Sequence, residues 1–258
     1  MQNFKNTIIT LSLAITTCAS LAACGGGLDA GNSDRELALE AGESGDFPIA
    51  EGEASTLVIT NNIGKITLTG GSDSTNVSVS TEQGPDYDAL ADEGILVVTW
   101  LEGDQLVVQV EGPDGSEQAV DIEIEAPTDL TVAIRGDEHT VSVSGMRGTG
   151  AVNTTDGDIR FDDYQGGSLA LDASGGDISF SASDFGYSRV AMTSQDGDID
   201  VTLPADAAFT LAATSSSGSA TVSGFDVPAF GGFAGGDVNG GGGRVVAYTT
   251  GNVSVSAD

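Results

Sequence analysis

A five-residue motif recurs through the second half of the chain and limits the folds available to it. Each copy holds a glycine, a polar residue, and then an alternation of apolar and polar residues. The copies are Gly157–Phe161, Gly176–Phe180, Gly197–Val201, Gly218–Val222 and Gly251–Val255, with an earlier relative at Gly64–Leu68. From residue 157 on, successive glycines are 19, 21, 21 and 33 residues apart. A period near 20 residues is typical of a solenoid, in which each repeat forms one coil.

Alternation within the motif predicts which side chains face the core, because successive strand residues point to opposite sides. Two inward rows are expected: Ile159, Ile178, Ile199, Ala220 and Val253 in the first, and Phe161, Phe180, Val201, Val222 and Val255 in the second. We therefore predict an all-β fold, a parallel β-solenoid with coils of about 20 residues, in which glycine turns each corner with a positive φ. An antiparallel sandwich of similar hairpins would produce much of the same local pattern.

The rest of the body also favours short strands. Alternating or β-branched segments lie at 57–59, 63–68, 77–79, 95–101, 105–110 and 120–125. An acidic loop is expected at 82–94, and no window shows a sustained helical period. The glycine-rich insertion 228–243 should fold over the end of the solenoid, because an exposed strand edge invites aggregation. A mobile loop that contacts a ligand is the alternative.

The N-terminus predicts a secretory signal with a lipid site. Lys5 precedes a mostly apolar stretch at 7–20, and Leu21–Cys24 reads Leu-Ala-Ala-Cys. This resembles the bacterial lipobox, in which the signal is cut before the cysteine and the cysteine is acylated. An ordinary signal peptide is the alternative. The chain would then be held at a membrane by the lipid on Cys24, since several acyl chains together anchor firmly.

These observations divide the chain into three parts. We predict a lipoprotein signal peptide at 1–23, a flexible acidic tether at 24–46, and a solenoid domain at 47–258. The chain has 39 acidic and 8 basic residues, a formal net charge of −31. Such a surface repels phosphate backbones, so no nucleic-acid partner is expected. The acidity is also compatible with a saline habitat.

Few residues could carry chemistry. The two cysteines are Cys18, inside the predicted signal, and Cys24, so the mature body offers no thiol nucleophile and no cysteine-based metal site. His139 is the single histidine and is expected in an exposed turn. We therefore predict no catalytic residue, no cofactor and no resident metal.

The aspartates of the motif are the remaining candidates. Asp158, Asp177 and Asp198 share one repeat position and should project outward as a ladder. Turn capping, in which each carboxylate accepts a backbone N–H, is the favoured interpretation. Weak cation binding along the ladder and catalysis by paired carboxylates are the alternatives. Sugar-cleaving sites usually stack rings on aromatic side chains, and Trp100 is the single tryptophan.

Several motifs together resemble a known family. They are the repeated Gly-Asp-Ile with Thr or Ser shortly before it, Leu203-Pro204, and the final Thr249–Val253. The chain is similar over about 47–258 to bacterial adhesin-like β-solenoid domains, whose biochemical function is unknown. The resemblance implies a right-handed coil on the cell envelope and supplies no catalytic residues. Ser219 and Asn252 depart from the pattern, because Asp is usual at both positions.

We expect a lipid-anchored, non-enzymatic protein of the cell envelope with a binding or structural role. It should be extracytoplasmic, with the outer membrane favoured over the inner, and its partner should be an envelope or extracellular polymer. One alternative is a carbohydrate-active β-solenoid enzyme that uses outward carboxylates. Another is an envelope accessory protein that senses stress or a ligand.

Overall fold

The computed structural model of the protein describes residues 36–40, 42–49, 52–61, 64–71, 76–83, 96–111 and 120–258. All of them belong to one unit, Ser33–Asp258. The predicted signal peptide, the predicted lipid site Cys24 and most of the predicted acidic loop lie outside the described residues. Within the described ranges, no helix is long and apolar enough to cross a membrane.

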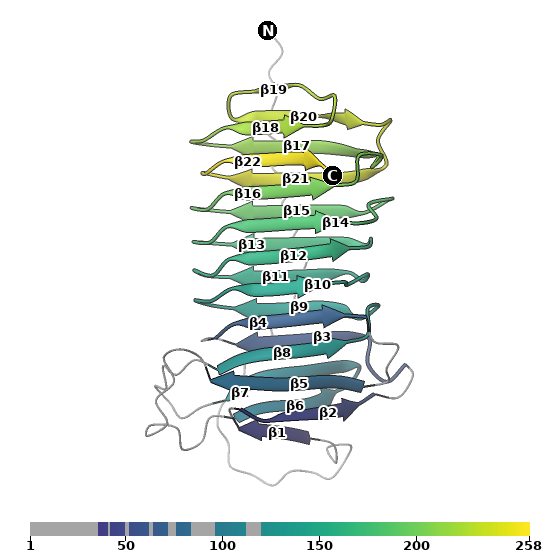
Figure 1. Ribbon diagram of the computed structural model, residues 1–258, viewed down its shortest axis with the longest axis vertical. Helices are drawn as coiled ribbons and strands as arrows, with labels where there is room; N and C mark the ends of the chain where they lie inside the picture. The colour runs from purple at the N-terminus through teal and green to yellow at the C-terminus, as the bar shows by residue number, and fades with distance from the viewer. Residues whose placement is uncertain are drawn as a thin grey trace. The chain divides into compact units, whose positions relative to one another are not determined.

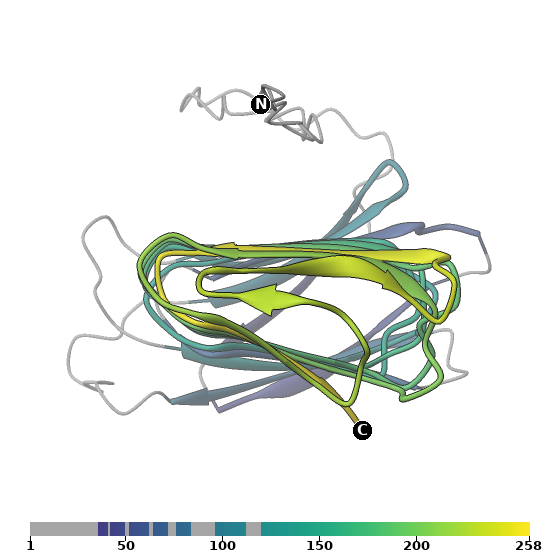
Figure 2. The same ribbon diagram turned by 90° about the horizontal axis from the view of Figure 1, so that it is seen from above.

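The strands of these residues form two sheets that face each other across a flattened coil (Figure 2). Sheet A runs, in hydrogen-bonded order, β1 (Glu36–Glu40), β6 (Leu96–Glu102), β7 (Gln105–Glu111), β3 (Thr56–Asn61), β9 (Thr131–Gly136), β11 (Gly150–Thr154), β13 (Ser168–Ala173), β15 (Arg189–Ser194), β21 (Gly243–Thr249), β17 (Phe209–Ser215), β20 (Phe233–Val238) and β19 (Ala229–Phe230). Sheet B runs β18 (Ala220–Ser223), β22 (Val253–Ala257), β16 (Ile199–Leu203), β14 (Ile178–Ala182), β12 (Ile159–Tyr164), β10 (Val141–Ser144), β4 (Ile66–Gly70), β8 (Val120–Ala126), β5 (Asn76–Gln83) and β2 (Ser44–Pro48).

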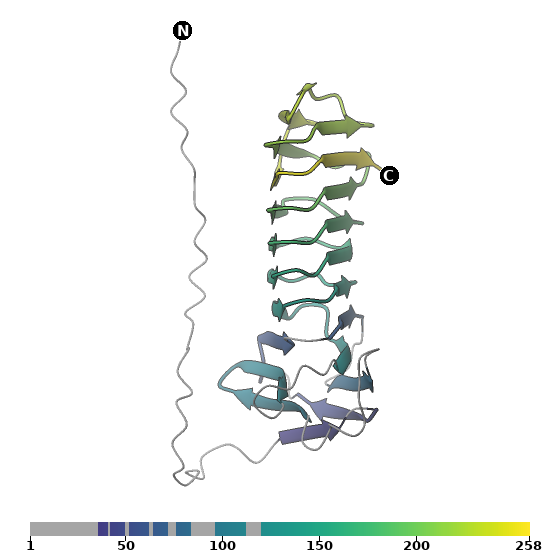
Figure 3. The same ribbon diagram turned by 90° about the vertical axis from the view of Figure 1, so that its left-hand side faces the viewer.

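Each coil of the stack gives one strand to each sheet, so the strands form two columns (Figures 1 and 3). Neighbouring coils pair in parallel, with Ile178 in register between Ile159 and Ile199. All three side chains are at most 1% exposed. The predicted parallel β-solenoid and its inward rows are confirmed, and the antiparallel sandwich is excluded. In the second row only Val222 is incompletely buried.

The order of the coils in space differs from their order in the chain at both ends of the stack. The last coil in sequence, β21 and β22, lies one place inside: β21 pairs with β15 and β17, and β22 pairs with β16 and β18 (Figure 1). The first inward row therefore runs Ile199, Val253, Ala220. The coil of β3 and β4 is inserted in the same way, between β7 and β9 and between β8 and β10.

Antiparallel strands cover the ends of the stack. At one end the glycine-rich insertion folds back, so that β20 pairs with β17 and β19 pairs with β20. This confirms that the insertion covers an end of the solenoid. At the other end β6 and β1 extend sheet A, and β5 and β2 extend sheet B. These strands pair both edges of the parallel coils in sheet A and the β8 edge in sheet B, while β18 remains the edge strand at the other end of sheet B.

The predicted flexible tether at 24–46 extends too far. Strand β1 and most of β2 fall inside that range, and Leu39 is 5% exposed within the core. The segment Glu36–Glu40 reads Glu-Leu-Ala-Leu-Glu, and a strand period of two places Leu37 and Leu39 together on the side of an edge strand that faces the core. Its acidic composition hid that period. The folded region therefore begins before Phe47.

Candidate functional site

The motif aspartates form a ladder that joins neighbouring coils. Asp158 Oδ1 accepts a hydrogen bond from the backbone N–H of Asp177 (2.9 Å), and Asp177 Oδ1 accepts one from the N–H of Asp198 (2.7 Å). The series continues from Asp198 to the N–H of Asn252 (2.6 Å). Each carboxylate does accept a backbone N–H, but the prediction that it caps its own turn is wrong. The donor belongs to the next coil and not to the residue's own turn.

The backbone pattern explains why a short acceptor is needed here. The N–H of Ile178 donates to the carbonyl of Asp198, so the motif residue uses its carbonyl in the parallel ladder. The N–H of Asp198 points to the same coil, where the Asp177 carboxylate takes the place of a carbonyl acceptor at the corner. Asn252 does the same through its Oδ1, which accepts from the N–H of Ser219 (3.1 Å). Ser219 precedes β18, the edge strand of sheet B, so no further coil needs an acceptor from it.

A second ladder consists of buried hydroxyl groups, which in most coils lie three residues before the motif glycine. Ser194 Oγ donates to the carbonyl of Gly176 in the neighbouring coil (2.9 Å) and accepts from the N–H of Gly197 in its own turn (2.9 Å). Thr249 and Ser215 make the corresponding pairs of bonds in the next two coils. These hydroxyl groups provide hydrogen-bond partners for backbone N–H and carbonyl groups at the corners, which water cannot reach. This accounts for the Thr or Ser that precedes the motif.

The corner glycines are required by crowding between coils. None of Gly157, Gly176 and Gly197 has a positive φ. A Cβ on Gly176 would lie 2.3 Å from the carbonyl oxygen of Gly157, and a Cβ on Gly197 would lie 2.2 Å from that of Gly176. The expectation of a positive φ at these corners is therefore wrong. Glycine occurs there because a side chain would collide with the backbone of the next coil.

The aspartate ladder offers little for catalysis. Its carboxylates are engaged in hydrogen bonds between coils, and in the described ranges no three His, Cys, Asp or Glu side chains are grouped to hold a metal ion. Burial raises the pKa of the Asp172 carboxyl, on the outer face of sheet A, above its ordinary value. Its register partners are Asn153 and Thr193, so the adjoining strands provide no second carboxylate for an acid–base pair. Weak cation binding along the ladder stays a prediction.

Two substitutions at Asp177 separate hydrogen bonding from charge. Asp177→Ala leaves the N–H of Asp198 without its acceptor and should lower the free energy of unfolding by about 1 kcal/mol. Asp177→Asn keeps an acceptor oxygen, as Asn252 does, and should stay within about 0.5 kcal/mol of the wild type. Denaturant titration measures both. A larger loss for Asn than for Ala would show that the charge matters more than the hydrogen bond.

The cation prediction is tested with the same proteins. Unfolding midpoints are compared in calcium and in sodium of matched ionic strength. Screening of the repulsion between the carboxylates acts without ion preference. A midpoint that rises in calcium alone, and only when Asp177 is intact, would establish a cation site. Equal unfolding midpoints in the two salts would mean that the salts act only by screening the repulsion between the carboxylates.

The outer face of sheet B is polar along its whole length. Two rows of outward positions beside the aspartate ladder carry Thr67, Ser142, Arg160, Ser179, Asp200, Ser254 and Thr221 in the first, and Thr69, Ser144, Asp162, Ser181, Thr202, Ser256 and Ser223 in the second. An open depression of about 590 Å³ lies where β2 and β5 meet this face, with Glu123 and Glu125 among its lining residues.

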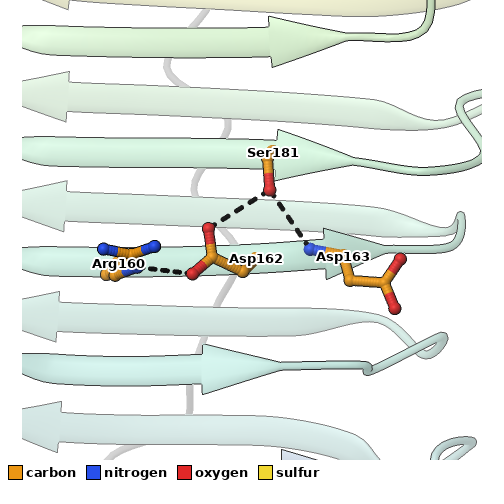
Figure 4. A network of polar contacts seen from close by, with 4 residues as sticks. All are labelled: Arg160, Asp162, Asp163 and Ser181. Atoms are coloured by element: carbon orange, nitrogen blue, oxygen red, sulfur yellow. Dashed lines mark hydrogen bonds and ion pairs between the residues drawn. The ribbon is translucent and has the colours of Figure 1, made fainter. Parts of the chain in front are cut away.

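A β-bulge interrupts this face at β12 (Figure 4). Ser181 Oγ donates to Asp162 Oδ1 (3.2 Å) and accepts from the N–H of Asp163 (3.2 Å), while Arg160 pairs with Asp162. Asp163 has a φ of 54°. The extra residue turns Tyr164 into the core, where burial raises the pKa of its phenol. Sequence reasoning missed Tyr164, although the three-residue spacing from Phe161 breaks the alternation and signals a bulge.

The outer face of sheet A is different in character. Its central row is apolar and runs, in register, through Val58, Ala133, Ala151, Ala170, Ala191, Val246 and Ala212. The rows beside it are polar in the middle of the stack. Toward β21 they carry Arg189 and Arg244 on one side and Tyr248 on the other. The two faces of the solenoid therefore present distinct chemistry.

The remaining candidates from the sequence are spread over the fold. His139 is partly exposed in the turn between β9 and β10, as part of the corner that packs against Gly157. Trp100 lies on β6, in register with Glu36 and Val107 near one end of sheet A. Tyr187 and Tyr248 lie in coils toward the opposite end of the stack. These residues do not form the aromatic cleft that a sugar-cleaving enzyme would need.

The amino-acid sequence matches a known protein family. The model of the Toastrack DUF4097 family matches residues 4–229. The chain belongs to the Toastrack DUF4097 family. This confirms the family-level resemblance drawn from the repeated motif. No curated protein matches the chain.

Several solved structures are similar to this chain at low identity. One is a candidate cell adhesion protein from Clostridium sporogenes, with 10% identity and a TM-score of 0.44, covering 84% of this chain and 99% of its own. A second is a candidate adhesin from Bacteroides fragilis, with 12% identity and a TM-score of 0.33, covering 88% and 99%. A third is a candidate lipid-binding protein from Parabacteroides distasonis, with 11% identity and a TM-score of 0.28, covering 88% and 98%.

Proposed function

We propose that this Toastrack protein is a lipid-anchored, non-enzymatic component of the bacterial envelope whose solenoid is a rigid post for binding an envelope or extracellular polymer. The observation that carries the proposal is that the motif residues make hydrogen bonds between coils. The aspartates and the buried hydroxyl groups bind neighbouring coils, so the repeat builds length and not a reaction centre. A stack of this kind is stiff because each coil is bonded to both neighbours.

The geometry supports a role in presenting a surface. Sheet A has β1 at one end and the strands β17, β20 and β19 at the other. With neighbouring strands about 4.8 Å apart, this sheet is about 50 Å long. The first described strand of the chain, β1, lies at one end of the stack (Figure 1). A lipid on Cys24 would therefore tether the chain at its β1 end, and we propose that the protein is extracytoplasmic and anchored to the outer rather than the inner membrane.

Cys24→Ser tests the anchor. The substitution removes the acylated thiol, and each lost methylene removes about 0.8 kcal/mol of membrane affinity. We expect the variant to remain unprocessed or to become soluble, measured by the mass of its N-terminal peptide and by detergent phase partition. Cys18→Ser is the matched control, because it lies within the discarded signal and should leave processing unchanged. A Cys24→Ser protein that is still cut at residue 24 and still partitions into detergent would contradict the anchor.

A further inference from the structure

Two arginines lie side by side on the outer face of sheet A. Arg189 and Arg244 are register partners on β15 and β21, and both are exposed. The chain has 8 basic residues and a net charge of −31, yet neither arginine forms an ion pair with the described residues. Like charges opposite one another on adjacent strands are destabilising. The pair therefore opposes folding and calls for an explanation outside the fold.

Exposed aromatic side chains occur at the same end of the stack as this pair. The large apolar side chains most exposed in the described ranges are Tyr187 (91%), Phe230 (75%), Phe233 (50%) and Tyr248 (47%), all from the coils at this end. Tyr248 shares β21 with Arg244, and Val246 lies between them on the same face. The Phe233 ring covers Gly235, two residues further along the same strand β20, where a Cβ would lie 2.9 Å from Phe233 Cζ.

We define the distal patch as Tyr187, Arg189, Arg244, Val246, Tyr248 and Phe233. These residues come from β15, β21 and β20 and from the turn before β15, with β17 between β21 and β20, so charge and aromatic surface occur together at this end of sheet A. Beside the patch, the turns at 165–168 and 184–189 enclose an open depression of about 400 Å³.

The turn that contains Tyr187 is anchored to the core by the side chain of Phe185. The Phe185 ring packs against Phe180 and Phe209, with centroid distances of 6.4 and 5.8 Å, so the next two residues must protrude. The buried hydroxyl of Ser188 makes no hydrogen bond within the described part of the chain. Asp184 is the one acid in this lining, and its Oδ1 accepts from the N–H of Gly186 (3.2 Å). The depression thus lies beside a cation and an exposed aromatic ring, and the unpaired Ser188 hydroxyl is buried at its edge.

We propose that the distal patch binds a carboxylated polysaccharide. This inference rests on the proposed function, because it names the class of polymer that the post would bind. Guanidinium groups match carboxylates in geometry and charge, and the paired arginines would hold the acid groups of the polymer. The faces of Tyr187, Tyr248 and Phe233 suit the apolar faces of sugar rings, while the flat row at Val246 admits an extended chain. A neutral polymer would leave the arginine pair unused.

Charge-matched variants test this assignment. Binding of polygalacturonate, dextran and dextran sulfate to the full-length lipoprotein in detergent is measured by titration at about 0.15 M salt, where charges farther apart than about 8 Å are screened. We expect polygalacturonate to bind, and Arg189→Gln with Arg244→Gln to weaken binding about tenfold or more. Arg135→Gln with Arg160→Gln removes the same charge elsewhere and should leave the affinity unchanged. Tyr187→Ala should weaken binding about three- to tenfold without unfolding the protein.

Other outcomes would overturn the assignment. Equal weakening by the two arginine pairs would mean that bulk charge, and not the patch, governs binding. Tighter binding of dextran sulfate through the same arginines would identify a general anion site. Absence of polymer binding together with self-association that needs Arg189 and Arg244 would make a second copy of the chain the partner. The Cys24 experiment is independent of these results. Failure of the polysaccharide assignment would therefore not count against the proposed lipid anchor.

Discussion

Removal of Gly243–Asp258 should disorder more of the solenoid than the deleted residues. These residues form β21 and β22, which lie between the coil of β15 and β16 and the coil of β17 and β18. Loss of a terminal coil removes one interface between coils, whereas loss of this inner coil removes two. The deletion also removes the fully buried Val245 and Val253, each worth about 1.5–3 kcal/mol.

Hydrogen exchange followed by mass spectrometry gives the readout for this truncation. We expect the amides of β17 and β18 to lose protection, because β17 would keep only its antiparallel partner β20 and β18 would lose its partner in sheet B. The coils from β9 to β14 should stay protected and serve as the internal control. Protection of β17 and β18 at the level of the full chain would mean that they restack directly on β15 and β16, contrary to this expectation.

Gly176→Ala should be among the most damaging single-methyl changes in the molecule. Its Cβ would lie 2.3 Å from the carbonyl oxygen of Gly157, 2.5 Å from the carbonyl carbon and 2.8 Å from the backbone nitrogen of Asp158. All three atoms belong to the backbone of the neighbouring coil, so relief requires the coils to separate. We expect a loss of about 3 kcal/mol or more, a large share of the 5–15 kcal/mol typical of a folded domain.

Gly186→Ala is the matched control for this substitution. Gly186 is exposed, does not have a positive φ, and a Cβ there would meet only Asp184 Oδ1 at 3.7 Å. Its free energy of unfolding should change by less than about 0.5 kcal/mol. Chemical denaturation of both variants provides the comparison. Similar stabilities for the two proteins would contradict close packing of the coils at the glycine corners.

Much of the fold follows from local patterns in the sequence. Alternation places Ile159, Ile178 and Ile199 inward, and burial of these residues fixes the register. The strands of the first half were also predictable, because β-branched runs there are bounded by turn residues. The edge strand at Glu36–Glu40 was hidden, since its acidic positions match those of a tether.

The coil order and the candidate site could not be predicted in the same way. Equivalent coils have similar sequences, so the repeat does not specify that β21 stacks on β15 ahead of β17. That insertion alone brings Arg244 beside Arg189. The crowding at Gly176 was equally hidden, because a glycine in sequence indicates freedom of φ as readily as close approach of another chain segment.

If the motif residues hold the coils together and the distal patch binds polymer, two variants should behave in opposite ways in one experiment. The unfolding midpoint and the affinity for polygalacturonate are measured side by side for Asp177→Ala and for Arg189→Gln with Arg244→Gln. We expect Asp177→Ala to lower the midpoint and keep the wild-type affinity at temperatures where it is folded. The double arginine variant should keep or raise the midpoint and lose about tenfold or more in affinity. Loss of affinity in the folded Asp177→Ala protein, with binding intact in the arginine variant, would place the binding site on the motif ladder and contradict this division of roles.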